Sequence, residues 1–180
     1  MKLTSRQIAL GGALAAFSSA VQLVHIGYQS PQWGMWLDLV AVSWIAAFFL
    51  FGTKISLIVS LLGTIVITFF SPDTWLGASM KFTATLPLIF TLSLHSKTNY
   101  STLKKLILPV ILALIIRSLL VVPLNYYYAL PIWTGMTPAT AIKVIPWYVI
   151  AAFNSVQLLI DVSFAWILVY RFRLNRYARN

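Results

Sequence analysis

The 180-residue sequence contains no cysteine, and its three acidic residues are far outnumbered by 13 lysines and arginines. The lack of cysteine excludes a disulfide, a thiolate nucleophile and a cysteine metal site. Charged residues make up only 9% of the chain, too few to cover the surface of a water-soluble domain. Because 60% of the residues are hydrophobic, the composition indicates a single integral membrane domain over residues 1–180.

Motifs for ATP hydrolysis and for intramembrane catalysis are also missing. The sequence has no GxxxxGK[ST] segment and no HExxH segment. Its three acids, Asp38, Asp73 and Asp161, lie far apart in the sequence and suggest no catalytic carboxylate pair. We therefore expect a protein that is not an enzyme, with no metal site and no cofactor of its own.

Apolar segments separated by short polar stretches predict an all-α, polytopic membrane fold. A membrane-spanning helix needs about 20 apolar residues, so this length allows roughly six spans. The expected spans are residues 8–26, 36–51, 55–70, 78–94, 106–128 and 146–170. The first 20 residues also resemble a secretory signal, and cleavage there would leave five spans.

The distribution of lysine and arginine predicts the orientation of these spans. If the N-terminus is cytoplasmic, the basic residues between and after the spans fall on the cytoplasmic side, except Lys143. This pattern places both termini in the cytoplasm of a multi-pass protein of the cell membrane. It also explains the net charge of +10 without nucleic acid, and the basic C-terminal tail suits anionic lipid headgroups.

Two charged residues fall inside the predicted spans. Arg117 and Asp161 lie at similar depth near the middle of the last two spans, where an isolated charge is costly. We therefore predict an Arg117–Asp161 ion pair between adjacent helices. The pair either fixes the helix register or forms the floor of a polar cavity, and the sequence leaves both interpretations open.

Amide side chains extend this polar face. Asn154, Gln157 and Asp161 share one face of the last span by their three- and four-residue spacing, and Asn125 shares the face of Arg117. An amide both donates and accepts hydrogen bonds, which suits a polar heterocyclic ligand. The same amides also suit hydrogen bonds between helices, so spacing alone does not separate a ligand site from helix packing.

Aromatic residues gather in the two predicted outer loops, residues 27–38 and 125–147. They form either an interfacial aromatic belt or the lid and walls of an outward-facing pocket. The aromatic residues in question are Tyr28, Trp33, Trp36, Tyr126, Tyr127, Tyr128, Trp133 and Trp147.

The first span carries small residues at four-residue spacing. They are Ala9 and Ala13 in one series, and Gly12, Ala16 and Ala20 in another. Small residues at this spacing let a second helix approach closely. The second helix belongs either to this chain or to a partner membrane protein.

Together these features resemble the substrate-binding S components of energy-coupling factor (ECF) vitamin transporters, and most closely their riboflavin-specific branch. Three segments carry the likeness: LNYYYALPIW (124–133) resembles that branch's NYY…LP segment, AAFNSVQ (151–157) resembles its PFNxxK segment, and WLDLVAVSWIAAFFLFG (36–52) resembles its LKxDxSxxPALxGxxxFG segment. The sequence departs from the branch at polar positions. Gln157 replaces a lysine, Lys81 an asparagine, and Val40, Ser43, Gly63 and Thr64 also differ.

The resemblance implies a binding protein that captures a small heterocyclic vitamin, with riboflavin the first choice and another vitamin or precursor the alternative. It implies that Asn125 and Asn154 contact the ligand and that Leu37 and Asp38 lie at the entrance; Trp36, Lys81, Tyr128 and Gln157 are further candidates. It also implies a membrane coupling subunit and two cytoplasmic ATPases as partners, docked on Ala9, Gly12, Ala13 and Ala16. A membrane assembly protein without a ligand is the competing interpretation.

Overall fold

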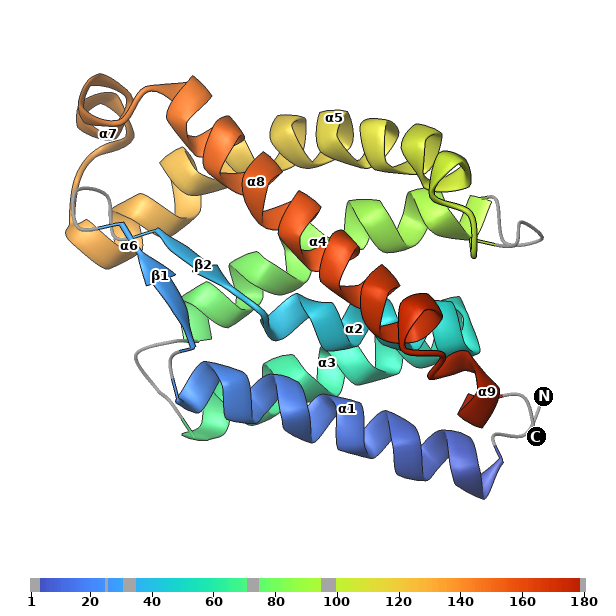
Figure 1. Ribbon diagram of the computed structural model, residues 1–180. Helices are drawn as coiled ribbons and strands as arrows, with labels where there is room; N and C mark the ends of the chain where they lie inside the picture. Colours follow the sequence, from blue (N-terminus) through green and yellow to red (C-terminus); the bar gives the residue numbers. More distant parts are fainter. Residues whose placement is uncertain (1–3, 25, 31–34, 71–74, 95–99, 179–180) are drawn as a thin grey trace.

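Long helices form most of the molecule (Figure 1). The structure is a computed structural model that describes residues 4–24, 26–30, 35–70, 75–94 and 100–178. Within these residues, six helices of 12 to 20 residues form one bundle: α1 (Ser5–Leu23), α2 (Val40–Phe51), α3 (Thr53–Phe70), α4 (Trp75–Leu94), α5 (Ile107–Leu124) and α8 (Trp147–Trp166). The all-α prediction is confirmed, and each helix lies close to a predicted segment.

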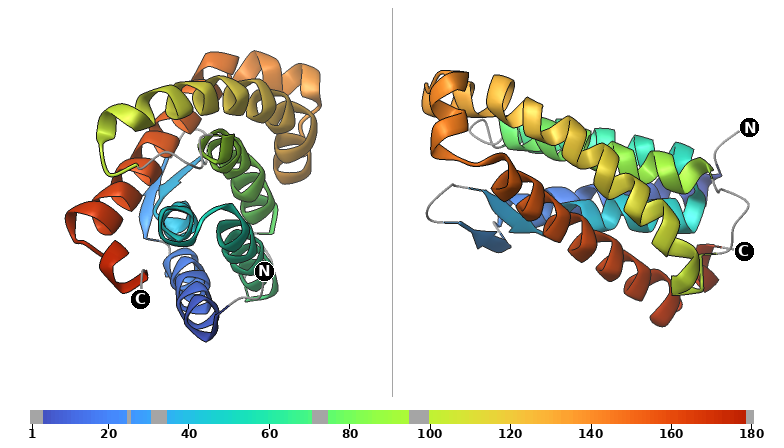
Figure 2. Two further views of the ribbon diagram at one scale, coloured as in Figure 1. Left: turned by 90° about the vertical axis from the view of Figure 1, so that its right-hand side faces the viewer. Right: turned by 90° about the horizontal axis from the view of Figure 1, so that it is seen from above.

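Shorter elements close the two ends of the bundle. They are β1 (Gly27–Gln29), β2 (Trp36–Asp38), η2 (Leu103–Leu106), η3 (Asn125–Ala129), α6 (Leu130–Thr134), α7 (Pro138–Val144), η4 (Ile167–Arg171) and α9 (Asn175–Ala178). Figures 1 and 2 place β1, β2, α6 and α7 at one end, which we call the hairpin end. The start of α1 and α9 lie together at the opposite end, as an even number of long helices requires.

Among the residues that the structure describes, three helices are long and apolar enough to cross a membrane. They are Thr53–Phe70, Leu103–Thr134 and Trp147–Arg171. Helix α2 is apolar but has only 12 residues. Helices α1 and α4 have sufficient length, but polar residues and glycines lower their hydropathy: Ser, Arg, Gln and Gly in α1, and Gly, Ser, Thr and Lys in α4. Three of the six predicted spans thus have the composition of a span, and the other three remain predictions.

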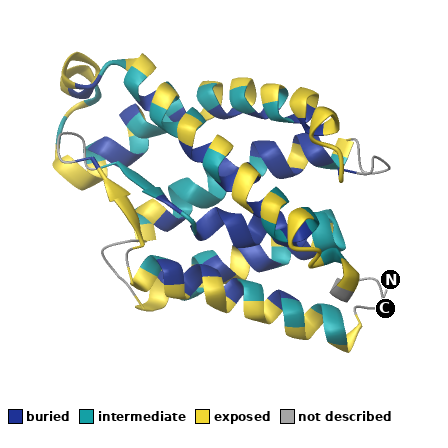
Figure 3. Cartoon of the chain, viewed as in Figure 1, coloured by how far each residue is buried: buried dark blue, intermediate teal, exposed yellow. Residues whose placement is uncertain are grey.

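The outward faces of the bundle are apolar, as lipid contact requires. Figure 3 shows exposed residues along the outer side of α5, where they include Ile111, Ile115 and Leu119 at four-residue spacing. A water-soluble helix would carry polar residues on this face. The molecule is therefore a membrane protein whose outer surface is solvated by hydrocarbon.

Helix α2 lies at the centre of the bundle. Every residue from Val40 to Phe48 is buried, and the helix contacts α1, α3, α4 and α8. Its mixture of Val, Ala, Ile and Phe with only one hydroxyl explains why so short a helix is buried on all sides. The hydroxyl of Ser56 on α3 donates to the carbonyl oxygen of Trp44 at 2.7 Å and links the two helices.

Close packing of α1, α2 and α3 depends on Gly63. A Cβ atom at this position would lie 2.5 Å from Ser18 Oγ and 2.9 Å from Trp44 Nε1. Both neighbours are fully buried, so a Cβ atom here would require one of them to shift. Glycine therefore lets α3 approach the large indole of Trp44 directly.

The two outer loops differ from the sequence prediction. Most of the described part of the first loop forms the antiparallel β1–β2 hairpin, in which Gly27 pairs with Asp38 so closely that a side chain would collide with Leu37 O. The second loop begins ten residues later than predicted, because η3 and α6 continue the helix of α5 to Thr134. A π-helical turn at Asn125–Ala129 follows Pro123 and lets the helix continue beyond it.

We expect Gly63→Ala to destabilise the protein, by about 1–3 kcal/mol as in other overpacked cores. The measurement is thermal unfolding of the detergent-purified protein. Gly12→Ala is the matched control, because a Cβ there would have no neighbour within 4 Å. Equal stability of the two variants would contradict the close packing described above.

Candidate functional site

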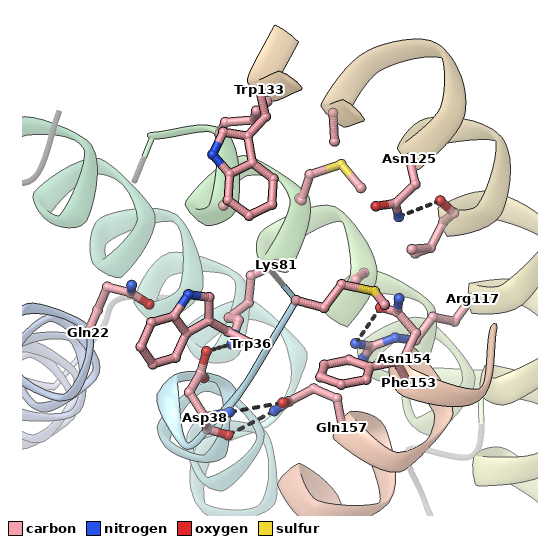
Figure 4. Close-up of a pocket in the computed structure, with 17 residues that line it drawn as sticks. Gln22, Trp36, Asp38, Lys81, Arg117, Asn125, Trp133, Phe153, Asn154 and Gln157 are labelled. Atoms are coloured by element: carbon pink, nitrogen blue, oxygen red, sulfur yellow. Dashed lines mark hydrogen bonds and ion pairs between the residues drawn. The ribbon is translucent and has the colours of Figure 1, made fainter. Parts of the chain in front are cut away.

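A cavity of about 240 Å³ opens between β2, α4, α5, η3 and α8 near the hairpin end (Figure 4). The volume lies just below the range of roughly 300–1,000 Å³ that is typical of ligand pockets. The wall is mostly apolar, with a small group of polar side chains. The polar group comprises Gln22, Asp38, Lys81, Arg117, Asn125, Asn154 and Gln157.

Asp38 at the end of β2 is the most heavily bonded of these residues. Its Oδ2 forms an ion pair with Lys81 on α4, and its Oδ1 accepts a hydrogen bond from the N–H of Val40 at 2.9 Å. The second bond satisfies an N–H of the first turn of α2. The carboxylate thus joins the hairpin, α2 and α4 at a single point.

Gln157 on α8 holds the main chain of the same residue. Its Oε1 accepts from the N–H of Asp38 at 3.0 Å, and its Nε2 donates to the carbonyl oxygen of Asp38 at 2.8 Å. Its Nε2 also donates to Asp161 Oδ1 at 2.8 Å. Both N–H bonds of the amide are therefore in use, so Gln157 lines the cavity mainly as a clamp on the hairpin.

Arg117 on α5 lies at the edge of the cavity facing Asn154 (Figure 4). Its Nη2 donates to Asn154 Oδ1 at 3.1 Å, and its side chain is only 4% exposed. Its Nε is buried and has no hydrogen-bond partner among the described residues. A buried cation whose bonded partner is neutral is costly unless a further acceptor is supplied.

The two predicted ligand-binding asparagines both line the cavity. Asn125 Nδ2 donates to the carbonyl oxygen of Val121 at 2.9 Å, and Asn154 Nδ2 donates to that of Ile150 at 3.0 Å. Each of these bonds runs back along the residue's own helix and fixes the orientation of the amide. The carbonyl end of Asn125 keeps its acceptor capacity toward the cavity.

Aromatic side chains cover part of the apolar wall. Trp36 on β2, Trp133 on α6 and Phe153 on α8 line the cavity together with Met35 and Met80. Such faces suit a planar ring, which buries apolar area and stacks on them. Of the predicted outer aromatic residues, Trp36 and Trp133 lie in the cavity wall.

The other predicted aromatic residues lie elsewhere. Tyr28, Tyr127 and Trp147 are between 58% and 68% exposed, as an interfacial belt would be. Tyr126 is buried and donates to the carbonyl oxygen of Ile145 at 2.6 Å. Tyr128 contacts Ser79 at 3.4 Å rather than lining the cavity, and Trp33 lies outside the described residues.

Leu37 also does not line the cavity, although its neighbours do. Side chains alternate between the two faces of a strand, so Trp36 and Asp38 share one face and Leu37 takes the other. The hairpin was expected to be a loop, in which this alternation does not apply. The predicted role of Leu37 at the entrance therefore receives no support from the geometry.

The predicted Arg117–Asp161 ion pair does not form. Within the described chain, Asp161 is bonded by Gln157 and Arg117 by Asn154, and the two charges stay beyond ion-pair distance. The ion pair that forms is Lys81–Asp38. Equal depth was not sufficient, because Arg117 contacts Asn154, about two helical turns before Asp161 on α8, and Gln157 between them bonds Asp161.

Nine residues that line the cavity were not predicted as site residues from the sequence: Gln22, Met35, Leu76, Gly77, Met80, Ala84, Val121, Ala129 and Phe153. Gln22 is the last polar residue of α1, and Phe153 directly precedes Asn154. No sequence pattern marks Met35 and Met80 as site residues, because single apolar residues near an expected loop or on an apolar helix are common. Only Gln22, a lone amide at the end of a predicted span, offered a signal.

The small residues of α1 occupy its free face. Ala9, Gly12, Ala13, Ala16 and Ala20 are all exposed, whereas a separate set, Gly11, Ala15, Ser18 and Ser19, packs against the bundle. The interpretation that these exposed residues serve packing within this chain therefore receives no support from the geometry. The face is available for a partner helix or for lipid.

We expect Lys81→Met to destabilise the protein by about 3–5 kcal/mol, because it leaves the buried Asp38 carboxylate without its cation. The double variant Lys81→Met with Asp38→Asn should recover much of the loss, since an asparagine oxygen still accepts from Val40. Thermal unfolding of both variants and of Asp38→Asn measures the coupling. If the double variant is as unstable as the sum of the single variants, the ion pair does not hold the hairpin.

No protein-family model matches the chain, and no curated protein matches it. Its fold does match a solved structure described as the "Structure and mechanism of the S component of a bacterial ECF transporter". The TM-score is 0.74 at 25% sequence identity, over 97% of this chain and 98% of that chain. The chain therefore has the fold of an ECF transporter S component, with a cavity suited to a substrate-binding role in transport.

Proposed function

We propose that the protein is the substrate-binding S component of an ECF-type vitamin transporter, which captures a small heterocycle at the hairpin end. The observation that carries the proposal is the cavity itself, where oriented amides and aromatic faces meet beneath a hairpin held by Asp38. Such a combination of planar apolar walls and few polar groups is typical of small-molecule sites. The likeness of the whole fold to an S component supports the same conclusion.

The cavity argues against a protein that serves only membrane assembly. Helix packing alone would pair Arg117 with a carboxylate or exclude it, and would not leave its Nε unbonded beside an open volume. A ligand site explains both features.

Riboflavin is the first ligand to test, because the segments around Asn125 and Asn154 resemble the riboflavin-specific branch. Another vitamin or a precursor is the alternative, since Gln157 and Lys81 replace polar groups of that branch. In this structure both of these residues are bonded to Asp38 and shape the hairpin. They therefore restrict the cavity where the branch has other side chains.

Transport would require partners that supply energy. We propose that both termini are cytoplasmic and that six helices span the cell membrane, as the positive-inside pattern indicates. The exposed small face of α1 would then dock on a membrane coupling subunit driven by two cytoplasmic ATPases. The small side chains at Ala9, Gly12, Ala13 and Ala16 allow close helix contact between the exposed Ile8 and Phe17.

If the ligand is riboflavin, the purified protein should be yellow or should quench added riboflavin fluorescence tightly. Asn154→Ala should weaken this binding by about tenfold or more, because it removes one oriented hydrogen-bonding group and unpairs Arg117. Ser155→Ala is the matched control, since its hydroxyl is bonded to Ala151 and does not line the cavity. A colourless protein without quenching would exclude riboflavin, and equal effects of both variants would exclude this site.

If α1 docks on a coupling subunit, Ala13→Trp should abolish substrate uptake in cells while binding to the purified protein is unchanged. The bulky ring would hold the partner helix away from the small face. Leu119→Trp is the control, because Leu119 is 73% exposed on α5, away from that face. Uptake that survives Ala13→Trp, or that both variants abolish alike, would contradict the docking assignment.

A further inference from the structure

We propose that Arg117 binds a carboxylate of the ligand, so that the substrate is a small ring-containing acid rather than a neutral heterocycle. The inference rests on the proposed function and narrows its substrate class. It favours the alternative to riboflavin, whose ring system is neutral. The argument starts from the charges at the cavity and the partners that each of them has.

Arg117 has less hydrogen bonding than its burial requires. A guanidinium carries five N–H donors, and only the bond from Nη2 to Asn154 is formed within the described chain. The partner is a neutral amide, the side chain is 4% exposed, and the buried Nε is unbonded. An oxyanion at the cavity would supply the charged acceptors that the protein does not provide.

The nearby anions are already engaged by other groups. Asp38 uses one oxygen for Lys81 and the other for the N–H of Val40. Asp161 accepts from Gln157 behind the cavity wall and does not line the cavity. Both aspartates attract Arg117 only from beyond contact distance. Asp38 cannot turn toward the guanidinium without losing its bonds, and Asp161 lies behind the cavity wall with Oδ1 bonded to Gln157.

Only one of the two cations that line the cavity contacts an anion among the described residues. Lys81 and Arg117 both line the cavity, and the contact with Asp38 neutralises Lys81. One cation is left without an anion in contact. A carboxylate brings one negative charge and two oxygens in the planar geometry that a guanidinium binds, whereas a phosphate brings more charge than one arginine balances.

The other residues that line the cavity indicate what the rest of the ligand contains. Trp36, Trp133 and Phe153 offer aromatic faces for a ring, and Asn125 offers an acceptor for a ring N–H or a hydroxyl. A volume of about 240 Å³ suits one or two rings with a short acidic arm. The acid would point toward α5 and the ring toward the hairpin.

The test is a thermal-shift and calorimetric screen of the full chain in detergent, with ring acids each paired with the corresponding primary amide. Pyridine-3-carboxylate with pyridine-3-carboxamide and indole-3-acetate with indole-3-acetamide begin the panel, and riboflavin is the neutral reference. We expect at least one acid to bind about tenfold or more tightly than its amide, since a charge-assisted bond is lost in the amide. Arg117→Gln should remove this preference, and Arg117→Lys should retain part of it.

Lys143→Gln is the control for general attraction of anions, because Lys143 is exposed on α7 at the same end of the molecule but does not line the cavity. The preference for acids should be unchanged in this variant. If Arg117→Gln does not fold, the acid-to-amide ratio in the unmodified protein and in Arg117→Lys decides the question.

Each other outcome overturns the inference. Binding of riboflavin or of the amides at least as tightly as the acids would leave the proposed function standing and remove the carboxylate. An acid preference that persists in Arg117→Gln would assign the anion to another residue. A panel in which no compound binds would count against both the carboxylate and the proposed function.

Discussion

Three contacts on Asp38 hold the hairpin against the helices and so determine whether the cavity exists. Lys81 pairs with its carboxylate, Gln157 brackets its main chain, and the N–H of Val40 ties it to the start of α2. These contacts join α4, α8 and α2 to a two-stranded element that would be marginal alone. Little water is present inside a membrane. Each bond therefore also satisfies a polar group whose burial without a partner would cost free energy. The cavity lies against this junction, so its shape follows from it.

Much of the fold could be predicted because hydropathy and charge constrain a membrane chain strongly. The apolar segments gave helices close to their observed limits, and the four-residue spacing of small residues on α1 placed Ala9 and Ala13 on one exposed face. The amides Asn125 and Asn154 were placed at the cavity from helical spacing together with the family resemblance. Periodicity is informative here because a polar residue on an apolar helix has few places to lie.

The remainder depended on contacts between segments far apart in the chain. Asp38 and Gln157 are 119 residues apart, and no spacing rule connects a strand residue to a helix residue at that distance. The predicted Arg117–Asp161 pair failed for the same reason, since depth alone does not show which partner each charge meets. The strands of the hairpin are too short to show an alternating sequence pattern. The sequence therefore did not reveal that Leu37 lies on the opposite strand face from Trp36 and Asp38. Helix periodicity therefore predicts which residues share a helix face, but only the tertiary structure shows which side chains bond to each other.

The most direct test of the central claim, that this cavity holds a small ring compound, is native mass spectrometry of the full chain. The detergent-purified protein would be incubated with a small-molecule extract of cells before measurement. The account predicts one adduct per chain, with the mass of a small ring compound, that is lost in Asn154→Ala and retained in Ser155→Ala. The absence of any adduct, or an adduct that persists equally in both variants, would contradict it.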